Sequence, residues 1–178
     1  MEIIKYEEVE STNKLAKEMV REGKVAPFCL VAGRQTSGVG NYGKKFWSPR
    51  GGLYMSLVLP EKDFRYRFGT GFVAVRLMEL IKGARIKWVN DILVDGKKVA
   101  GILVEKVAGH FVIGIGINLF QTEDVPEELV GVVGFLGYDI DVRDVVNVIT
   151  KTKLSDENVR ELYTKYSGTP ISLDGSKV

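Results

Sequence analysis

"NDILVDGKKVAGILVE", residues 90–105, decides the fold, because an Asp-Gly pair stands there between two apolar runs. Such a pair is the strongest short-range signal for a β-hairpin, so we predict a two-residue turn at Asp95 and Gly96. The turn fixes the cross-strand pairs, which are Val94 with Lys97, Leu93 with Lys98, Ile92 with Val99, and Asp91 with Ala100. Strands joined by so tight a turn pair antiparallel, which makes an antiparallel sheet the starting point for the fold.

The hairpin also carries two adjacent lysines whose side chains point to opposite faces of the sheet. The predicted register puts Lys98 on the same face as Asp91 and the apolar Leu93 and Ala100. Lys98 and Asp91 are then diagonal neighbours at roughly 7–8 Å, a gap that a long side chain can close. Lysines at strand ends commonly keep a hairpin soluble, and we expect Lys97 to have only this surface role. For Lys98 a surface role and a functional role both remain open.

Outward from the hairpin, apolar patterns predict further strands over residues 3–6, 28–32, 53–59 and 111–118. A helix is predicted over residues 72–81, and others are expected after the N-cap residues Ser11, Asp141 and Ser155. The apolar face of the last helix is predicted to hold Val159, Leu162 and Tyr166. This mixture predicts an α+β fold, with a mixed, mostly antiparallel sheet and helices packed on one face.

Length and composition favour one globular domain. The chain has 178 residues, 45% of them hydrophobic and 27% charged, and a net charge of +2 gives no large field to attract a polyanion. A single cysteine excludes an internal disulfide, and no apolar run approaches the roughly 20 residues that span a bilayer. We expect a main domain over residues 1–168 with a tail over 169–178, in a cytoplasmic protein without nucleic-acid or membrane partners.

The stretch "GRQTSGVGNYGKKFWSPRGG", residues 33–52, is predicted to be a long loop. Its glycines allow a ligand to approach the backbone closely, and its free N–H groups suit anionic oxygens. Lys44 and Lys45 add cations, while Phe46 and Trp47 could stack on a base. The pattern is neither a Walker A sequence nor a dinucleotide fingerprint. A phosphate-binding loop and a flexible surface loop are the two interpretations.

Several motifs occur together in one order, and in that order they resemble biotin protein ligases. They are "STN" at 11–13, "RQTSGVGNYGKKFWSP" at 34–49, "KWVND" at 87–91, "KKVAGILVE" at 97–105 and "IGIGINL" at 113–119. The element "KVAG" is shared with lipoate-protein ligases, whereas the glycine loop and "KWVND" favour biotin. The resemblance covers roughly the first 120 residues, and it implies a catalytic domain like that of class II aminoacyl-tRNA synthetases.

The resemblance implies an ATP-dependent enzyme that activates biotin to biotinyl-AMP and transfers it to a lysine of a biotin carboxyl carrier domain. Lys98 would be the catalytic residue. The biotin-binding residues would be Ser11, Thr12, Asn13, Gln35, Gly38, Gly40, Asn41, Lys98 and Gly101. The ATP-binding residues would be Lys44, Phe46, Trp47, Lys87, Asn90, Asp91 and Asn118. Asp91 would also meet the Mg²⁺ that accompanies ATP, and the resemblance allows a homodimer.

The chain departs from the family pattern in the loop. Val39 and Asn41 replace arginines, so Asn41 stands where an arginine would grip the acyl phosphate, and Lys44 or Lys45 could compensate. Val89 replaces the proline of "KWPND". We expect no N-terminal DNA-binding domain, because the motifs begin at residue 11, and we expect residues 169–178 to be a tail or a remnant of the C-terminal domain.

Two other functions stay open at this point. A lipoate-protein ligase would use the same fold and adenylate chemistry, and a non-catalytic biotin- or nucleotide-binding module would account for the missing loop arginines. Ser11 serves equally as a helix cap, and Trp88 suits the core as well as the site. His110 is expected at the surface and Cys29 in the core, which leaves no cysteine or Ser-His-Asp nucleophile.

Overall fold

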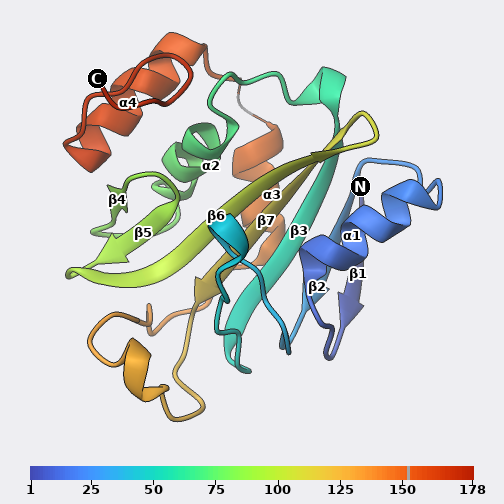
Figure 1. The fold of residues 1–178 in the computed structure, drawn as a ribbon, viewed down its shortest axis with the longest axis vertical. Coiled ribbons are helices and arrows are strands. Elements are labelled where there is room, and N and C mark those ends of the chain that lie inside the picture. Colours follow the sequence, from blue (N-terminus) through green and yellow to red (C-terminus); the bar gives the residue numbers. More distant parts are fainter. Residues whose placement is uncertain (152) are drawn as a thin grey trace.

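A computed structural model describes residues 1–151 and 153–178 of the chain. Seven strands form one sheet in the order β1-β2-β3-β7-β6-β5-β4 (Figure 1). The strands are β1 (Glu2–Tyr6), β2 (Phe28–Ala32), β3 (Gly52–Pro60), β4 (Arg85–Lys87), β5 (Asp91–Val94), β6 (Lys97–Val107) and β7 (His110–Asn118). Only β1 and β2 pair in parallel, and every other neighbouring pair is antiparallel. The predicted mixed, mostly antiparallel sheet is confirmed.

Three of the four helices in the described residues begin at a capping side chain, and the helix that begins after Phe68 has none. The four helices are α1 (Thr12–Arg21), α2 (Gly69–Leu77), α3 (Val142–Thr150) and α4 (Asp156–Ser167), with short 3-10 turns η1 (Asn41–Gly43), η2 (Glu61–Asp63) and η3 (Glu127–Leu129). The side chains of Ser11, Asp141 and Ser155 accept hydrogen bonds from backbone N–H groups of α1, α3 and α4, so all three predicted N-caps are confirmed. The most deeply buried residues of α4 are Val159 and Tyr163. Leu162 and Tyr166 are only partly buried and pack at the edge of the main core.

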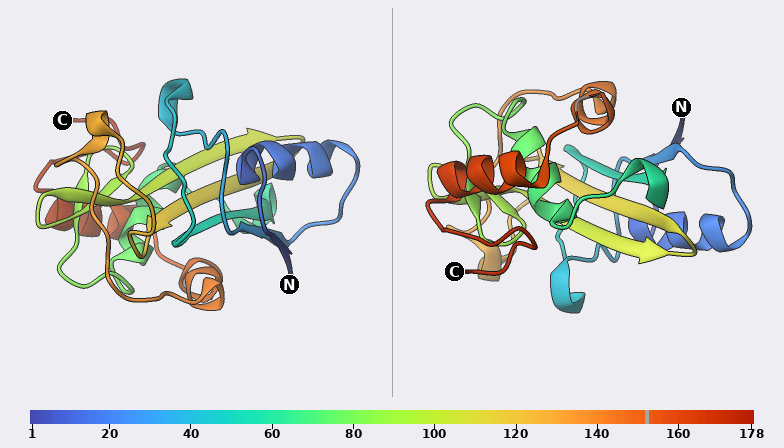
Figure 2. Two further views of the ribbon diagram at one scale, coloured as in Figure 1. Left: turned by 90° about the horizontal axis from the view of Figure 1, so that it is seen from below. Right: turned by 90° about the horizontal axis from the view of Figure 1, so that it is seen from above.

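Successive side chains along each strand point to opposite faces of the sheet, and both faces carry apolar residues. Ile113 and Ile115 of β7 belong to the large core beneath α2, α3 and α4, while Val112 belongs to a smaller cluster with Ala16 and Val20 of α1. Figure 2 shows α1 and α3 on opposite sides of the sheet. Three helices therefore share one face as predicted, and α1 packs on the other face because its own apolar stripe needs cover.

The β5–β6 hairpin begins as predicted and then shifts register. Val94 pairs with Lys97 and Leu93 with Lys98, but Ile92 pairs with Ala100 and Asp91 with Gly101. The predicted pairs of Ile92 with Val99 and of Asp91 with Ala100 are therefore wrong, because a β-bulge inserts Val99 as an extra residue. Val99 and Ala100 are both buried in the core. The bulge thus leaves Lys98 and Gly101, three positions apart, on the same face.

The last ten residues pack against the body of the protein. Ile171 is buried in the main core, and Ile171 and Lys177 form an isolated bridge. Trp88 Nε1 donates a hydrogen bond to the carbonyl of Gly175 at 3.2 Å, and Lys177 Nζ lies 4.6 Å from the centre of the Trp88 ring. Within the described residues, no helix combines the length and apolarity that a bilayer span requires.

Candidate active site

The motif residues gather around one cavity on the face of the sheet that α1 covers. It has a volume of about 330 Å³, which is within the range of small-molecule sites. From the predicted biotin set, the lining includes Ser11, Thr12, Asn13, Gln35, Gly40, Asn41 and Gly101. From the predicted ATP set, it includes Lys44, Phe46, Lys87, Asn90 and Asp91, and Lys98 belongs to the same lining. Figure 1 shows η1 and its loop in front of β6 and β7, and residues 39–42 and 44–46 of that loop line the cavity.

Lys98 is held at the floor of this cavity by two partners. Its Nζ lies 2.6 Å from Asp91 Oδ1, and only 27% of the Lys98 side chain and 21% of the Asp91 side chain are exposed. The predicted contact between the two residues is confirmed. Lys98 Nζ also lies 5.3 Å from the centre of the Phe46 ring, a cation–π distance. Lys97 is exposed, which agrees with the surface role predicted for it.

Glycines on β6 and β7 let the loop lie directly on the sheet. A Cβ added to Gly116 would come within 2.5 Å of the Phe46 ring, and one added to Gly101 within 2.8 Å. Real Cβ atoms essentially never approach so closely, so the bare backbone at these positions makes room for the ring. Gly114 does the same for Asn13, whose Oδ1 would lie 2.3 Å from an added Cβ.

The start of α1 supplies hydroxyl and amide groups to the cavity. Ser11 caps the helix, through a 3.4 Å hydrogen bond from the Lys14 N–H, and it also lines the cavity, so the capping role does not remove it from the site. The backbone N–H of Thr12 donates to Gln35 Oε1 at 2.8 Å, and Gln35 Nε2 donates to Ser48 Oγ at 2.9 Å. These bonds tie the helix to the start of the loop.

The loop over residues 38–46 is a small hairpin anchored at its base. Val39 and Lys45 bridge each other, and the Phe46 N–H donates to the Gly38 carbonyl at 2.8 Å. At the tip, Tyr42 has a positive φ of 58° and is 90% exposed. Beyond the loop, the Tyr54 hydroxyl donates to the Pro49 carbonyl at 2.7 Å. Burial raises the pKa of the Tyr54 phenol, which therefore stays a protonated donor.

The segment "KWVND" is fixed from both sides. Asn90 Nδ2 donates to the Ile102 carbonyl at 3.0 Å, and the Ile102 N–H donates back to the Asn90 carbonyl at 3.0 Å. The Tyr163 hydroxyl of α4 donates to the Val89 carbonyl at 3.0 Å. Burial raises the pKa of the Tyr163 phenol, and the nearby Asp91 carboxylate raises it further. The peptide bond between Trp88 and Val89 is cis.

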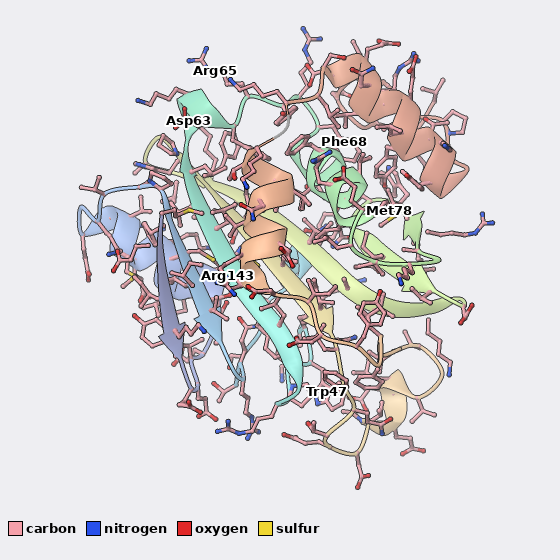
Figure 3. The ribbon with its side chains drawn as sticks, turned by 180° about the vertical axis from the view of Figure 1, so that it is seen from behind. Trp47, Asp63, Arg65, Phe68, Met78 and Arg143 are labelled. Atoms are coloured by element: carbon pink, nitrogen blue, oxygen red, sulfur yellow. The ribbon has the colours of Figure 1, made fainter. Side chains whose placement is uncertain are left out.

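Three predicted site residues lie outside the cavity lining. Gly38 is buried behind the loop, where an added Cβ would lie 2.5 Å from the Phe46 carbonyl oxygen. Trp47 packs edge-on against Phe135 at 6.4 Å between ring centres, and Figure 3 shows it beside the chain near η3. Asn118 is buried, and its Nδ2 donates to the Lys98 carbonyl at 3.2 Å. Gly38 and Asn118 thus support Phe46 and Lys98 from behind, whereas Trp47 packs away from the cavity.

Sequence reasoning did not name several residues that build the site. Tyr42, Gly114 and Gly116 line the cavity, while Tyr54 and Tyr163 hold its walls. The alternation of glycine and isoleucine in "IGIGI" at 113–117 was a usable signal, because it leaves one face of a strand bare. The two tyrosines gave no local signal, since their partners lie on other elements.

The charge around the cavity suits a polyanion. Lys44, Lys45, Lys87 and Lys98 line it, and Asp91 is the one acidic residue in the described lining. No three His, Cys, Asp or Glu side chains cluster as a metal site anywhere in residues 1–151 or 153–178. A lone carboxylate still suits Mg²⁺, which on nucleotides uses one or two carboxylates together with phosphate oxygens and water.

Comparison with known proteins agrees with this geometry. The model of the biotin/lipoate A/B protein ligase family matches residues 6–119. The bifunctional ligase/repressor BirA of Bacillus spizizenii is 32% identical over 186 aligned positions, which cover 96% of this chain and 57% of that protein. The biotin--[acetyl-CoA-carboxylase] ligase of Paracoccus denitrificans is 33% identical over 129 positions, covering 65% of this chain and 53% of that protein.

A solved structure extends the likeness to the fold. The biotin protein ligase of Aquifex aeolicus in complex with biotin and ATP has a TM-score of 0.67 and 32% identity, covering 95% of this chain and 73% of that one. The present chain thus spans somewhat more than half the length of the Bacillus relative and about three quarters of the Aquifex chain. Because the family model matches more than half of its residues, this protein belongs to the biotin/lipoate A/B protein ligase family.

Proposed function

We propose that this chain is a biotin protein ligase, which uses ATP to convert biotin into biotinyl-AMP and transfers the biotinyl group to a lysine of a biotin carboxyl carrier domain. The observation that carries the proposal is the position of Lys98, an ammonium group held at the floor of a cavity that other lysines surround. The Aquifex relative is named for a complex with biotin and ATP, and the Paracoccus relative for biotin ligation.

In the first step, an oxygen of the biotin carboxylate attacks the α-phosphorus of ATP, and the bond to pyrophosphate breaks. Both reactants are anions, and two unit charges about 4 Å apart repel by about 4 kcal/mol at an effective dielectric of 20. A fixed cation between them removes most of that repulsion and stabilises the charge that develops in the transition state. Lys98 supplies it, and Asp91 keeps the ammonium group in place until the substrates arrive.

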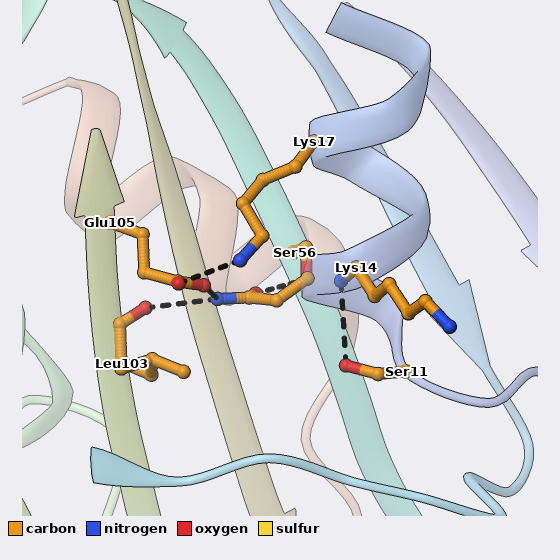
Figure 4. Close-up of polar contacts among 7 residues, drawn as sticks. Ser11, Lys14, Lys17, Ser56, Leu103 and Glu105 are labelled. Atoms are coloured by element: carbon orange, nitrogen blue, oxygen red, sulfur yellow. Dashed lines mark hydrogen bonds and ion pairs between the residues drawn. The ribbon is translucent and has the colours of Figure 1, made fainter. Parts of the chain in front are cut away.

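The polar groups at the start of α1 suit the ureido ring of biotin. A ureido group offers two N–H donors and one carbonyl acceptor, and Ser11, Thr12 and Gln35 bring hydroxyl and amide groups to the cavity. Among the described residues, the Ser11 oxygen accepts a single long bond from Lys14 (Figure 4), and its own proton is available to donate to a ligand.

Lys44 and Lys45 of the loop would bind the phosphate of biotinyl-AMP and retain it in the cavity. Asn41 lines the cavity where the family carries an arginine, but Lys44 and Lys45 line the same wall. Because ammonium groups pair with phosphate as point charges, two lysines can replace a guanidinium in charge, although they lack its bidentate geometry. We infer that the affinity for biotinyl-AMP falls as ionic strength rises.

Mg²⁺ would accompany ATP and neutralise part of its phosphate charge. Asp91 is the residue we assign to it, because it is the acidic group within the described lining. The remaining ligands would be phosphate oxygens and water. Asp91 also holds Lys98, so its two oxygens would divide between an ammonium group and a metal ion.

In the second step, the neutral amine of an acceptor lysine attacks the acyl carbonyl of biotinyl-AMP. An amide bond forms, the bond to AMP breaks, and the amine loses a proton. The acceptor lysine must enter through the mouth of the cavity, and the exposed Tyr42 at the loop tip lines that opening.

The proposal is tested by ATP–pyrophosphate exchange with biotin, lipoate or octanoate as the acid, followed by transfer of labelled biotin to a carrier domain. We expect exchange with biotin and transfer to the acceptor lysine. Exchange driven by lipoate instead would assign the chain to lipoate ligation. Tight biotin binding with neither exchange nor transfer would make it a binding module.

A further inference from the structure

The strand that pairs with the outer part of β6 ends before it reaches Lys98. The pairing of β6 with β7 stops at Ala100 and Ile117, two positions short of Lys98. Further along the chain, residues 132–137 come back to β6, and we call them the return segment. An isolated parallel bridge joins Lys98 to Val133 of this segment. Because β5 occupies the other edge of β6 at this position, the return segment takes the place of β7 beside Lys98.

Both backbone groups of Lys98 form hydrogen bonds with the return segment. The Lys98 N–H donates to the Val132 carbonyl at 2.8 Å, and the Lys98 carbonyl accepts from the Gly134 N–H at 2.8 Å. The same carbonyl also accepts from Asn118 Nδ2 at 3.2 Å. Three hydrogen bonds thus fix the peptide groups on either side of Lys98. A side chain is placed precisely only when the main chain that carries it is fixed in this way.

The return segment also contacts the glycine-rich loop. Phe135 packs edge-on against Trp47, with 6.4 Å between the ring centres. Trp47 directly follows Phe46, whose ring centre lies 5.3 Å from Lys98 Nζ. The segment therefore contacts the main chain of Lys98 on one side, and on the other side it contacts the loop residue next to the ring on which the ammonium group lies. Trp47, which lies outside the cavity lining, joins these two contacts.

Gly134 allows the return segment to lie this close to β6. The residue is buried, and a Cβ added to it would come within 2.8 Å of the Lys97 Cβ and 3.3 Å of Val99 Cγ1. The Lys97 Cβ is bonded directly to the backbone, so it cannot rotate out of the way. A methyl group at position 134 would therefore push the return segment and β6 apart at Lys98.

We propose that the return segment is a positioning element of the active site, which holds the main chain of Lys98 so that the ammonium group stays beside Asp91 at the floor of the cavity. Gly134 and Phe135 are its positioning residues. The inference rests on the proposed function, because it concerns the lysine to which that function assigns the decisive charge. Neither Gly134 nor Phe135 belongs to the described lining of the cavity, so both act through Lys98 and the loop.

The test compares Gly134→Ala and Phe135→Ala with the conservative variant Phe135→Tyr and the control Val130→Thr. Val130 is 65% exposed and precedes the return segment, and threonine keeps its shape. For each variant we measure kcat, KM for biotin and KM for ATP by pyrophosphate exchange, together with the melting temperature. A readout independent of activity is the rate at which acetic anhydride acetylates Lys98 relative to Lys97, measured by tandem mass spectrometry.

We expect Gly134→Ala and Phe135→Ala each to lower kcat by about tenfold to a hundredfold, the cost of misplacing a reacting group by up to about 1 Å. Both KM values should stay within about twofold of the parent, and so should every parameter of Phe135→Tyr and Val130→Thr. In the parent, Lys98 should be acetylated several-fold more slowly than Lys97, because its ammonium group is ion-paired and only about one quarter exposed. The two alanine variants should remove most of this difference.

An unchanged kcat in both alanine variants would overturn the inference and leave the proposed function standing. A loss of kcat in Phe135→Tyr as large as in Phe135→Ala, with equal rises in both KM values, would also overturn it, because general damage would then explain the effect. If Gly134→Ala does not fold, the two Phe135 variants decide between these outcomes.

A parent protein without exchange would instead defeat the proposed function. Acetylation would then still test the inference, since it requires no turnover. An equal rate of Lys98 acetylation in the parent and in the folded alanine variants would reject the positioning role.

Discussion

Lys98→Met removes the ammonium group and keeps a long, unbranched side chain on the β6 bulge. If that group cancels the repulsion between two anions about 4 Å apart, its loss raises the barrier by about 4 kcal/mol. Each 1.36 kcal/mol corresponds to a factor of ten in rate, so biotin-dependent pyrophosphate exchange should fall by about a thousandfold. The effect should appear in kcat, because the charge matters most where the reacting oxygen and phosphorus meet.

The folded state should tolerate the same substitution better. The Lys98–Asp91 pair is about one quarter exposed, so water reaches the carboxylate that the change leaves behind. We expect a loss of about 1–3 kcal/mol in the free energy of unfolding, the cost of one partly buried unpaired group. Urea unfolding of the parent and the variant measures it.

Lys97→Met is the matched control. It sits one residue away on the same strand and is exposed, and we expect exchange within about twofold of the parent. Exchange by Lys98→Met within tenfold of the parent would refute the catalytic assignment. A thousandfold loss in both lysine variants would refute it as well, because general damage to the hairpin would then explain the effect.

Other consequences follow from contacts elsewhere in the chain. Gly116→Ala would place a Cβ within 2.5 Å of the Phe46 ring, and we expect a loss of about 1–3 kcal/mol in stability with weaker exchange; an unchanged melting temperature and rate would contradict the close packing. Burial raises the pKa of the Cys29 thiol from 9.0 to about 12, so the unfolded chain ionises first and stability should fall as pH rises from about 9 toward 12. Cys29→Ala should flatten that fall in urea titrations at several pH values, and an identical slope would reject the cause. Gly175→Ala meets a φ of +88° and should cost about 1–2 kcal/mol and shift the fluorescence of Trp88, whose indole donates to the Gly175 carbonyl; unchanged emission would show that the tail does not hold this tryptophan.

Local chemistry explains what the sequence could predict about the fold. Ser11, Asp141 and Ser155 cap helices because a side-chain oxygen satisfies N–H groups within the same few residues. The turn at Asp95 and Gly96 follows from backbone preferences of the same short stretch, and both residues have positive φ. Such features depend on no distant partner, so a pattern of neighbouring residues suffices to find them.

The bulge at Val99 could not be predicted in this way. A regular hairpin would place Lys98 and Gly101 on opposite faces, and nothing in the hairpin sequence signals the extra residue. The register is set by the core beneath α2, where both Val99 and Ala100 are buried. Packing against α2, which is distant in the sequence, therefore overrides the regular β5–β6 pairing next to Lys98 and Gly101.

In the active site, too, local motifs could be predicted, whereas features that depend on distant contacts could not. Its motifs named most of the lining, but the order "FW" at 46–47 does not say which ring faces the cavity. Phe46 lies there because Gly101 and Gly116 leave it room, while Trp47 packs on Phe135. Tyr163 was predicted only as part of a helix, since its partner Val89 is remote in sequence.

Detection of the acyl adenylate tests the central claim most directly. The chain would be incubated with ATP, Mg²⁺ and equal concentrations of biotin and lipoate, and the protein-bound nucleotides identified by mass spectrometry. Our account predicts biotinyl-AMP in the parent and in Lys97→Met, and only a trace in Lys98→Met. Lipoyl-AMP in the parent, or biotinyl-AMP at the parental level in Lys98→Met, would contradict it.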